Sequence, residues 1–304
     1  MIRDLRNTEW RTDTPSSRSL AFARDDITRA SAVPRSLSGV HSDRALTIAV
    51  TSPRNITCKR GLAAHLAAHL AARVRGANAS VCIVDTDLES RDVGVRFDVN
   101  APTFLDVAND LALRDGRTHV SELIRRIDPP GLYVLPTRLP QNAFVPLLHN
   151  KTTPLISRLR ASFDFVVVDA PVSVGLGTYD WERAMLREVD VLLVAVTAEA
   201  SSLGGALRYL NSLAAAKAKG ALPSSFVAHV VLTGRDDDGS RSLFTERDID
   251  RRLRGIPVIA SVPQLWGRHR PEGPLNLDFT TRVDRELSVI VDQIAEDQRT
   301  AGER

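Results

Sequence analysis

The stretch TIAVTSPRNITCKRGLAAHLAAHLAA (residues 47–72) decides the fold of this chain. It places an apolar, β-branched segment before a short polar turn, one lysine and a helix-forming run of Ala and Leu. A strand, a loop and a helix in this order direct the free N–H groups of the first helical turn toward an anion such as phosphate. The stretch therefore has the framework of a phosphate-binding loop.

The loop residues depart from the phosphate-binding pattern G-x-x-x-x-G-K-[ST]. Lys59 stands where the pattern has its lysine, but Cys58 replaces the glycine before it and Arg60 replaces the hydroxyl residue after it. The framework is present while most of the loop chemistry is replaced.

The composition of the 304-residue chain is that of an ordinary globular protein. No apolar run approaches the roughly 20 residues of a membrane span, and the first residues, MIRDLRNTEWRTD, are too polar for a secretory leader. Two cysteines are too few for a disulfide framework, which favours a reducing cytoplasm. A net charge of +3 permits contact with nucleic acid or an anionic membrane but argues for neither.

The first part of the chain differs from the rest. Residues 1–43 are rich in Arg, Ser, Asp and Thr without a sustained apolar period, so we expect a disordered polar tail. We assign residues 44–298 to one α/β domain and residues 299–304 to a polar C-terminal tail.

From Leu46 onward, short β-branched runs alternate with helical patterns. Near-continuously apolar strands alternating with helices predict a doubly wound, mainly parallel sheet with helices on both faces and ligands at the carboxyl ends of its strands. The predicted strands are Leu46–Thr51, Ser80–Asp85, Leu132–Pro136, Phe165–Asp169, Val191–Val196, Phe226–Leu232 and Pro257–Val262. The predicted helices are Leu62–Val74, Phe104–Leu113, Val120–Arg126, Pro154–Ala161, Leu203–Ala218, Glu246–Leu253 and Arg282 to about Glu296.

Carboxylates follow two of these strands. Because the carboxyl ends of parallel strands lie at one edge of the sheet, we expect them close to the loop. There they suit binding of Mg²⁺, directly or through water, and orientation of an attacking water. The two segments are VCIVDTDLESRDVG, with Asp85, Asp87 and Asp92, and FDFVVVDAPVSVG, with Asp169, Pro171 and Gly175.

Over about Leu46 to Glu296 the chain resembles the MinD/ParA group of P-loop ATPases, including the TadZ/CpaE-like localisation factors. The family loop K-G-G-x-G-K-T-T before L-A-x-N-L-A corresponds to residues 54–61 and the LAAHLA that follows. VDTDLESRDVGVRF is similar to the family's first switch region, VVVDAPVSVG to its D-x-P-x-G segment and GLYVLPTRLP to its G-L-x-V-L-P strand. The resemblance implies a P-loop NTPase-like three-layer sandwich, ATP or ADP as ligand, and a homodimer.

The resemblance also assigns roles to residues. Asp87 would be catalytic in an active enzyme, and Asp169 and Asp85 would hold Mg²⁺ if it is retained. The switch residues would be Asp85, Asp87, Asp92, Asp169, Pro171 and Gly175. The nucleotide-binding residues would be Arg54, Asn55, Thr57, Cys58, Lys59, Arg60, Gly61, Arg235 and Pro263.

The departures from the family loop change its chemistry. Asn55 and Ile56 replace glycines that let the backbone approach phosphate, and a β-branched residue resists positive φ. Arg60 removes the hydroxyl that the resemblance assigns to Mg²⁺ and puts a cation beside Lys59, which repels a metal ion. We expect Mg²⁺-dependent hydrolysis to be weak or lost, while metal-free nucleotide binding stays open.

Three functions remain open from the sequence. The first is a cytoplasmic positioning or assembly factor, a dimerising scaffold for a secretion, pilus, division or chromosome-segregation machine, reaching membrane or nucleoid through a partner. The second is a working ATPase with an unusual loop that cycles on a membrane or nucleoid. The third is non-specific DNA or membrane binding through the arginine runs at 251–254 and 268–270, for which a solvated surface is the competing interpretation.

We expect His65 and His69, four residues apart, to be structural rather than metal ligands.

Overall fold

The computed structural model describes residues 45–53, 57–87, 92–113, 119–127, 131–137, 145–172, 184–235, 244–263 and 281–302. The chain divides into two compact units, residues 1–32 and 33–304, and all described residues belong to the second. The expected tail at residues 1–43 lies outside the described residues.

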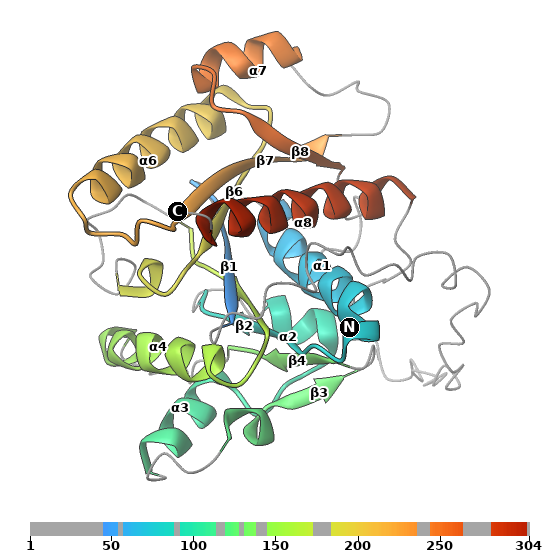
Figure 1. Ribbon diagram of the computed structural model, residues 1–304, viewed down its shortest axis with the longest axis vertical. Helices are drawn as coiled ribbons and strands as arrows, with labels where there is room; N and C mark the ends of the chain where they lie inside the picture. Colours follow the sequence, from blue (N-terminus) through green and yellow to red (C-terminus); the bar gives the residue numbers. More distant parts are fainter. Residues whose placement is uncertain are drawn as a thin grey trace, which may run out of the picture. The chain divides into compact units, whose positions relative to one another are not determined.

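The second unit contains an eight-stranded sheet with the order β3-β4-β2-β5-β1-β6-β7-β8 (Figure 1). All neighbouring strands pair in parallel except β3 and β4. The chain extends the sheet to both sides of β1, which confirms the doubly wound topology. The strands are β1 (Leu46–Thr51), β2 (Val81–Asp85), β3 (Arg125–Ile127), β4 (Leu132–Leu135), β5 (Phe165–Asp169), β6 (Val191–Val196), β7 (Val227–Arg235) and β8 (Val258–Pro263).

Helices cover both faces of this sheet (Figure 1). The apolar residues of α1, α2 and α8 pack on one face, and those of α3, α4, α6 and α7 on the other. Along β6, Leu192 and Val194 join one cluster and Leu193 and Ala195 the other, as strand geometry requires. The helices are α1 (Thr57–Val74), α2 (Asp92–Phe97), α3 (Phe104–Leu113), α4 (Val145–Arg160), α6 (Ala200–Ala218), α7 (Glu246–Leu253) and α8 (Thr281–Gly302), with 3₁₀ turns at Arg75–Ala77 and Val120–Leu123.

One predicted helix is wrong. Residues Val120–Leu123 form a 3₁₀ turn, and Arg125–Ile127 form the edge strand β3 instead of the expected helix Val120–Arg126. The apolar residues Val120 and Ile124, whose spacing suggested a helix, are both buried by this short turn and the residue after it. The two arginines that follow lie exposed at the sheet edge, where Arg126 lies over the ring of Tyr133 at 6.0 Å.

Other differences concern helix ends. The short helix α2 was not predicted, and α4 begins at Val145, so that Pro154 lies inside it. Helix α8 continues to Gly302, so the expected polar tail at residues 299–304 begins within a helix. Of the described helices, none has the length and apolarity of a bilayer-spanning segment.

Candidate functional site

Helix α1 brings Lys59 to the carboxyl edge of the central strands. Lys59 is the third residue of α1, and its side chain is only 1% exposed. Its Nζ lies 2.9 Å from Asp169 Oδ1 and 3.2 Å from Asp87 Oδ2. The same Nζ donates a hydrogen bond to the carbonyl of Ala170. An ammonium group has three N–H donors, so these three contacts match its full donor capacity.

Strand register explains why the carboxylates meet. Asp85 and Asp169 are the last residues of β2 and β5, and they lie directly opposite each other. Asp87 follows β2 by two residues, and its backbone N–H donates to Asp85 Oδ1 at 3.0 Å. The predicted proximity of these carboxylates to the loop is present in the structure, where two of them contact Lys59.

The backbone of residues 169–171 is fixed from three directions. Thr86 donates to the first carbonyl through both its N–H and its hydroxyl, each at 3.0 Å. Lys59 donates to the second, and the hydroxyl of Thr51 donates to the third at 2.7 Å. The last residue of β1, the first residue after β2 and the start of α1 thus all hold the end of β5.

The buried charges shift one another's protonation equilibria. Burial raises the pKa of Asp85 well above its usual range, and the neighbouring carboxylates of Asp169 and Asp87 raise it further. Burial alone would lower the pKa of Lys59, but Asp169 and Asp87 outweigh this effect, so the pKa is raised. The site therefore favours the charged form of Lys59 and disfavours the charged form of Asp85. Asp85 Oδ2 has no hydrogen-bond partner within the described part of the chain.

The position of Lys59 at the start of α1 explains why two carboxylates lie beside it. The first turn of α1 contains Lys59 and Arg60 and no acidic residue. Cations are unfavourable at a helix N-terminus because the helix dipole is positive there. Asp87 and Asp169 supply the negative charge that offsets both the dipole and the lysine.

A divalent metal does not fit the described arrangement. Asp87 and Asp169 are engaged by the ammonium, and Asp85 favours its neutral form. No group of three or more metal-ligating side chains occurs among the described residues. These carboxylates suit a buried ammonium ion, which is the group that they contact.

The other predicted site residues are placed as follows. Gly61 lies in α1 and Asp92 opens α2. Arg235 and Pro263 lie opposite each other at the ends of β7 and β8, and β6 separates these strands from β1. Thr57, Cys58 and Arg60 lie in the first turn of α1, where the structure describes their backbone and not their side chains. Arg54, Asn55 and Gly175 lie outside the described residues.

Two contributors were missed from the sequence. Thr86 separates the two aspartates of V-D-T-D, and Thr51 ends β1. Both hydroxyls donate to the backbone after β5. A hydroxyl residue where a buried strand ends at a candidate site was the available signal.

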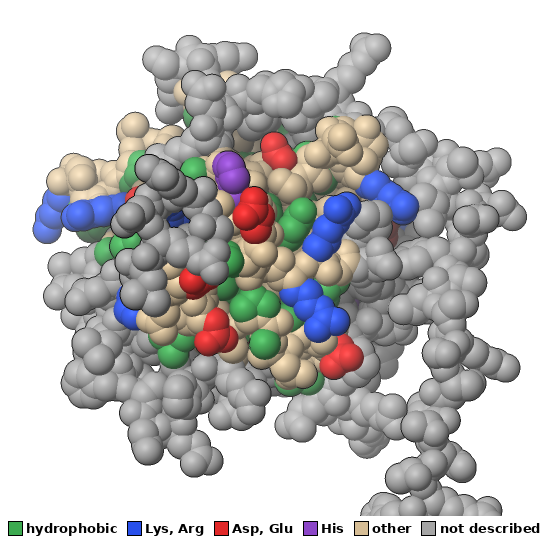
Figure 2. Space-filling view, turned by 90° about the horizontal axis from the view of Figure 1, so that it is seen from below, with side chains coloured by type: hydrophobic (Ala, Val, Ile, Leu, Met, Phe, Trp, Pro, Cys, Tyr) green, Lys and Arg blue, Asp and Glu red, His purple; other side chains and the backbone are tan. Residues whose placement is uncertain are grey.

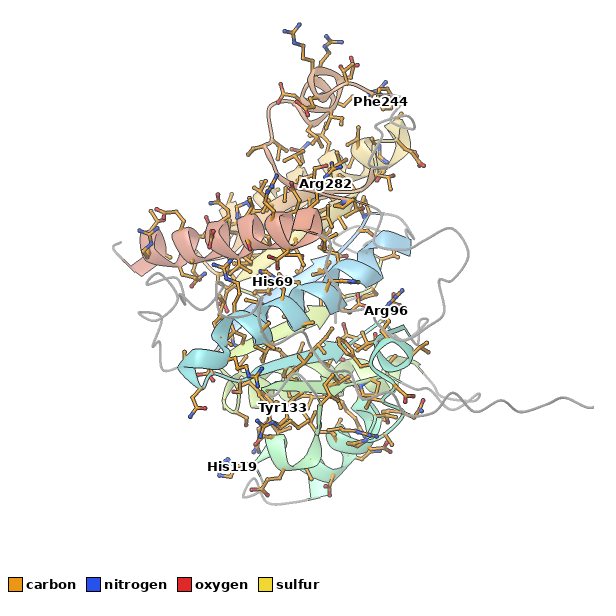
Figure 3. All side chains as sticks on the ribbon, turned by 90° about the vertical axis from the view of Figure 1, so that its right-hand side faces the viewer. His69, Arg96, His119, Tyr133, Phe244 and Arg282 are labelled. Atoms are coloured by element: carbon orange, nitrogen blue, oxygen red, sulfur yellow. The ribbon has the colours of Figure 1, made fainter. Side chains whose placement is uncertain are left out.

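The two histidines of α1 make structural contacts. His65 Nδ1 lies 2.8 Å from the Gly61 carbonyl, and burial lowers the pKa of His65 to about 4, so the neutral ring donates this bond. His69 lies beside α8 (Figure 3), with Nδ1 3.0 Å from Asp284 Oδ1 and Nε2 3.3 Å from Ser288 Oγ. These contacts give both histidines the expected structural role, within α1 for His65 and between α1 and α8 for His69.

The arginine run that ends α7 follows three acidic residues of the same helix. Arg251 lies 3.5 Å from Asp248, and Arg252 lies over the ring of Phe244 at 4.2 Å. Acidic and basic side chains are also interspersed on the face shown in Figure 2. The second run, at residues 268–270, lies outside the described residues. The described arginines therefore support the interpretation as a solvated surface.

Comparison with known proteins places this geometry in a fold family. No family model and no curated protein sequence matches the chain. Among solved structures, a ParA family ATPase from Chlorobium tepidum matches with a TM-score of 0.63 and 17% identity, over 81% of this chain and 97% of that one. The septum site-determining protein MinD of Pyrococcus horikoshii, complexed with Mg-ADP, matches with a TM-score of 0.61 and 16% identity over 82% and 96%.

A third match is the MinC:MinD cell division complex of Aquifex aeolicus, with a TM-score of 0.56 and 17% identity over 86% of this chain and 97% of that one. Each match spans nearly the whole of the other chain, and the identities are at a level that establishes the fold alone. The chain has the fold of the MinD/ParA P-loop ATPases.

Proposed function

We propose that the chain is a MinD/ParA-like positioning or assembly factor that acts as a dimerising scaffold for a partner protein. It binds ATP or ADP without rapid Mg²⁺-dependent hydrolysis. One observation carries this proposal: the Lys59 ammonium, which a P-loop enzyme directs at phosphate, is engaged by Asp87, Asp169 and a backbone carbonyl.

The sequence of the loop points the same way. Arg60 stands where a hydroxyl would bind Mg²⁺, and the nearby carboxylates are arranged around an ammonium. Without a binding site for Mg²⁺, the negative charge that develops during phosphoryl transfer is not neutralised, and hydrolysis is slow. The protein therefore binds nucleotide without hydrolysing it rapidly, and a scaffold needs only the binding.

The structural matches support the ligand and partner classes. The Pyrococcus horikoshii protein is complexed with Mg-ADP, and the Aquifex aeolicus protein forms a complex with MinC. In this chain we assign partner contact to the switch segments 85–94 and 169–175, because Asp87 and Pro171 within them are held beside Lys59. A partner could thereby sense the state of the site and carry the protein to a membrane or nucleoid.

The test is ATP turnover and calorimetric binding of ATP and ADP, each with and without Mg²⁺. We expect turnover at background and an affinity that Mg²⁺ does not raise. Robust Mg²⁺-dependent hydrolysis that Lys59→Ala abolishes would refute the proposal. Lys151→Ala, a lysine on α4 that donates to Asn109, is the matched control, and circular dichroism verifies that each variant folds. Sedimentation with and without nucleotide tests dimerisation.

A second candidate is a working ATPase with an unusual loop. It is favoured by the strand register, which places the carboxylates of Asp85 and Asp169 opposite each other at the ends of β2 and β5. The double change Cys58→Gly with Arg60→Thr discriminates between the two. If this change creates hydrolysis, the natural loop is inactive; natural hydrolysis that the change leaves unaltered identifies the working enzyme.

A further inference from the structure

The two carboxylates that hold Lys59 are anchored very differently. Asp169 is the last residue of β5 and pairs with Val50 of β1 on one side and Asp85 of β2 on the other. Its own carbonyl accepts two hydrogen bonds from Thr86. The backbone of Asp169 therefore cannot shift without disrupting the centre of the sheet.

Asp87 lies beyond the end of β2 and outside the strand ladder. Its backbone N–H donates to the side chain of Asp85, which turns the Asp87 carboxylate toward Lys59. Asp85 itself does not contact the ammonium through any hydrogen bond or ion pair between described residues, so it acts as a positioning residue for Asp87. Of the two carboxylates, Asp87 is the one whose backbone is not held by strand pairing.

We propose that Asp87 is an internal competitor for phosphate: its carboxylate occupies the position on the Lys59 ammonium that a phosphate oxygen needs, and phosphate binds only when Asp87 has moved away. This inference rests on the nucleotide binding proposed above and states how that binding is regulated. Phosphate binding thereby becomes coupled to the position of the Asp87 carboxylate.

Charge explains why the two anions exclude each other. Asp87 and Asp169 already place two carboxylates within 3.2 Å of one ammonium. A phosphate added to this group would bring a third anion to a site that is almost fully buried, where like charges repel strongly. Removing the charge of Asp87 restores the balance, because Lys59 then faces one carboxylate and the phosphate.

The experiment measures binding of ADP and of inorganic pyrophosphate by calorimetry in the absence of Mg²⁺, so that hydrolysis plays no part. Asp87→Asn keeps the size of the side chain and an oxygen that accepts from Lys59, but removes the charge. A hydrogen bond between charged groups is worth enough that we expect binding to strengthen by about tenfold or more. Asp87→Ser is the second variant if the first is poorly folded.

Two controls isolate the effect. Asp292→Asn makes the same change of net charge on α8, at a side chain that is 59% exposed and bound to Arg73, and it should leave both affinities unchanged. Lys59→Met added to Asp87→Asn should remove the gain, because the gain acts through the ammonium. Thermal melts verify the fold of every variant.

The outcomes separate this inference from the proposed function. Tighter binding by Asp87→Asn that depends on Lys59 supports the competitor. Equal affinity of the wild type and Asp87→Asn overturns it and leaves nucleotide binding intact. If neither protein binds either ligand, the competitor and the nucleotide-binding part of the proposed function are both wrong.

Discussion

Lys59→Met should destabilise the fold itself, independently of any ligand. The side chain is 1% exposed, and its ammonium lies within 3.2 Å of two carboxylates. Methionine fills a similar volume but leaves Asp87 and Asp169 buried without their cation. Breaking a buried ion pair by removing one partner costs about 3–5 kcal/mol, which corresponds to a fall in Tm of roughly 6–20 °C for a domain of this size.

The compensating variant sharpens this prediction. Lys59→Met combined with Asp87→Asn and Asp169→Asn replaces the charged cluster by neutral side chains of similar shape. Because a buried ion cluster is worth little relative to its neutral counterpart, we expect most of the lost stability to return. Lys151→Met on α4 is the surface control and should change the free energy of unfolding by less than about 0.5 kcal/mol.

The assay is urea unfolding at pH 7 followed by circular dichroism, with a thermal melt of each variant. The pH dependence has a defined sign. Because the pKa of Lys59 is raised above 10.5, its stabilising contribution is fully present below pH 10.5 and is lost as pH rises through the higher folded-state pKa. Lys59→Met within about 1 kcal/mol of the wild type would refute the reasoning, as would a triple variant no more stable than the single one.

Three further predictions test other parts of the fold. Asp85→Asn keeps the acceptor for the Asp87 N–H and removes a buried acid. Because the pKa of Asp85 is raised, the wild type loses stability as pH rises above 3.8. The gain in free energy of unfolding from the variant should therefore grow between pH 5 and 8 in urea titrations. A gain that is constant with pH would contradict this. Gly94→Ala should destabilise by about 1–3 kcal/mol, because its Cβ would lie 2.8 Å from the Val99 carbonyl oxygen. Gly204→Ala is its matched helical control, with no atom nearer than 3.7 Å, and should stabilise by about 0.5–1 kcal/mol; equal melting temperatures for the two would count against the packing argument. Thr245→Ala removes the capping box of α7 and should cost about 1 kcal/mol in thermal melts, whereas Thr245→Ser should retain most of it.

The sequence predicted the sheet well because its strands are buried on both faces. β1, β5 and β6 have the predicted bounds, since each is a β-branched run whose every residue is buried. Residues 120–127 were predicted poorly, because a short apolar spacing is compatible with a helix or a turn, and only pairing with β4 determines the edge strand. The local pattern of apolar residues therefore predicted the strands in the centre of the sheet and failed at the β3 edge.

The candidate site was predicted in part for a related reason. Parallel register alone brings Asp85 and Asp169 opposite each other, so their meeting followed from the strand ends. The partners of Lys59 did not follow, because a loop pattern specifies which residue is the lysine and not which anion it contacts. Thr51 and Thr86 donate to backbone carbonyls, and such bonds depend on the detailed path of the chain after β5.

Lys59 has a structural role in this chain, besides any contact with a nucleotide. A lysine at the start of such a helix is ordinarily explained by the phosphate that it binds. Here its burial is already accounted for by Asp87, Asp169 and the Ala170 carbonyl, and these contacts would stabilise the fold if no nucleotide ever bound. A loss of function in Lys59→Ala separates a missing ligand contact from a weakened fold when circular dichroism shows that the variant is folded. Asp87→Asn leaves Lys59 in place and removes its competitor, so it asks directly whether the ammonium binds a phosphate.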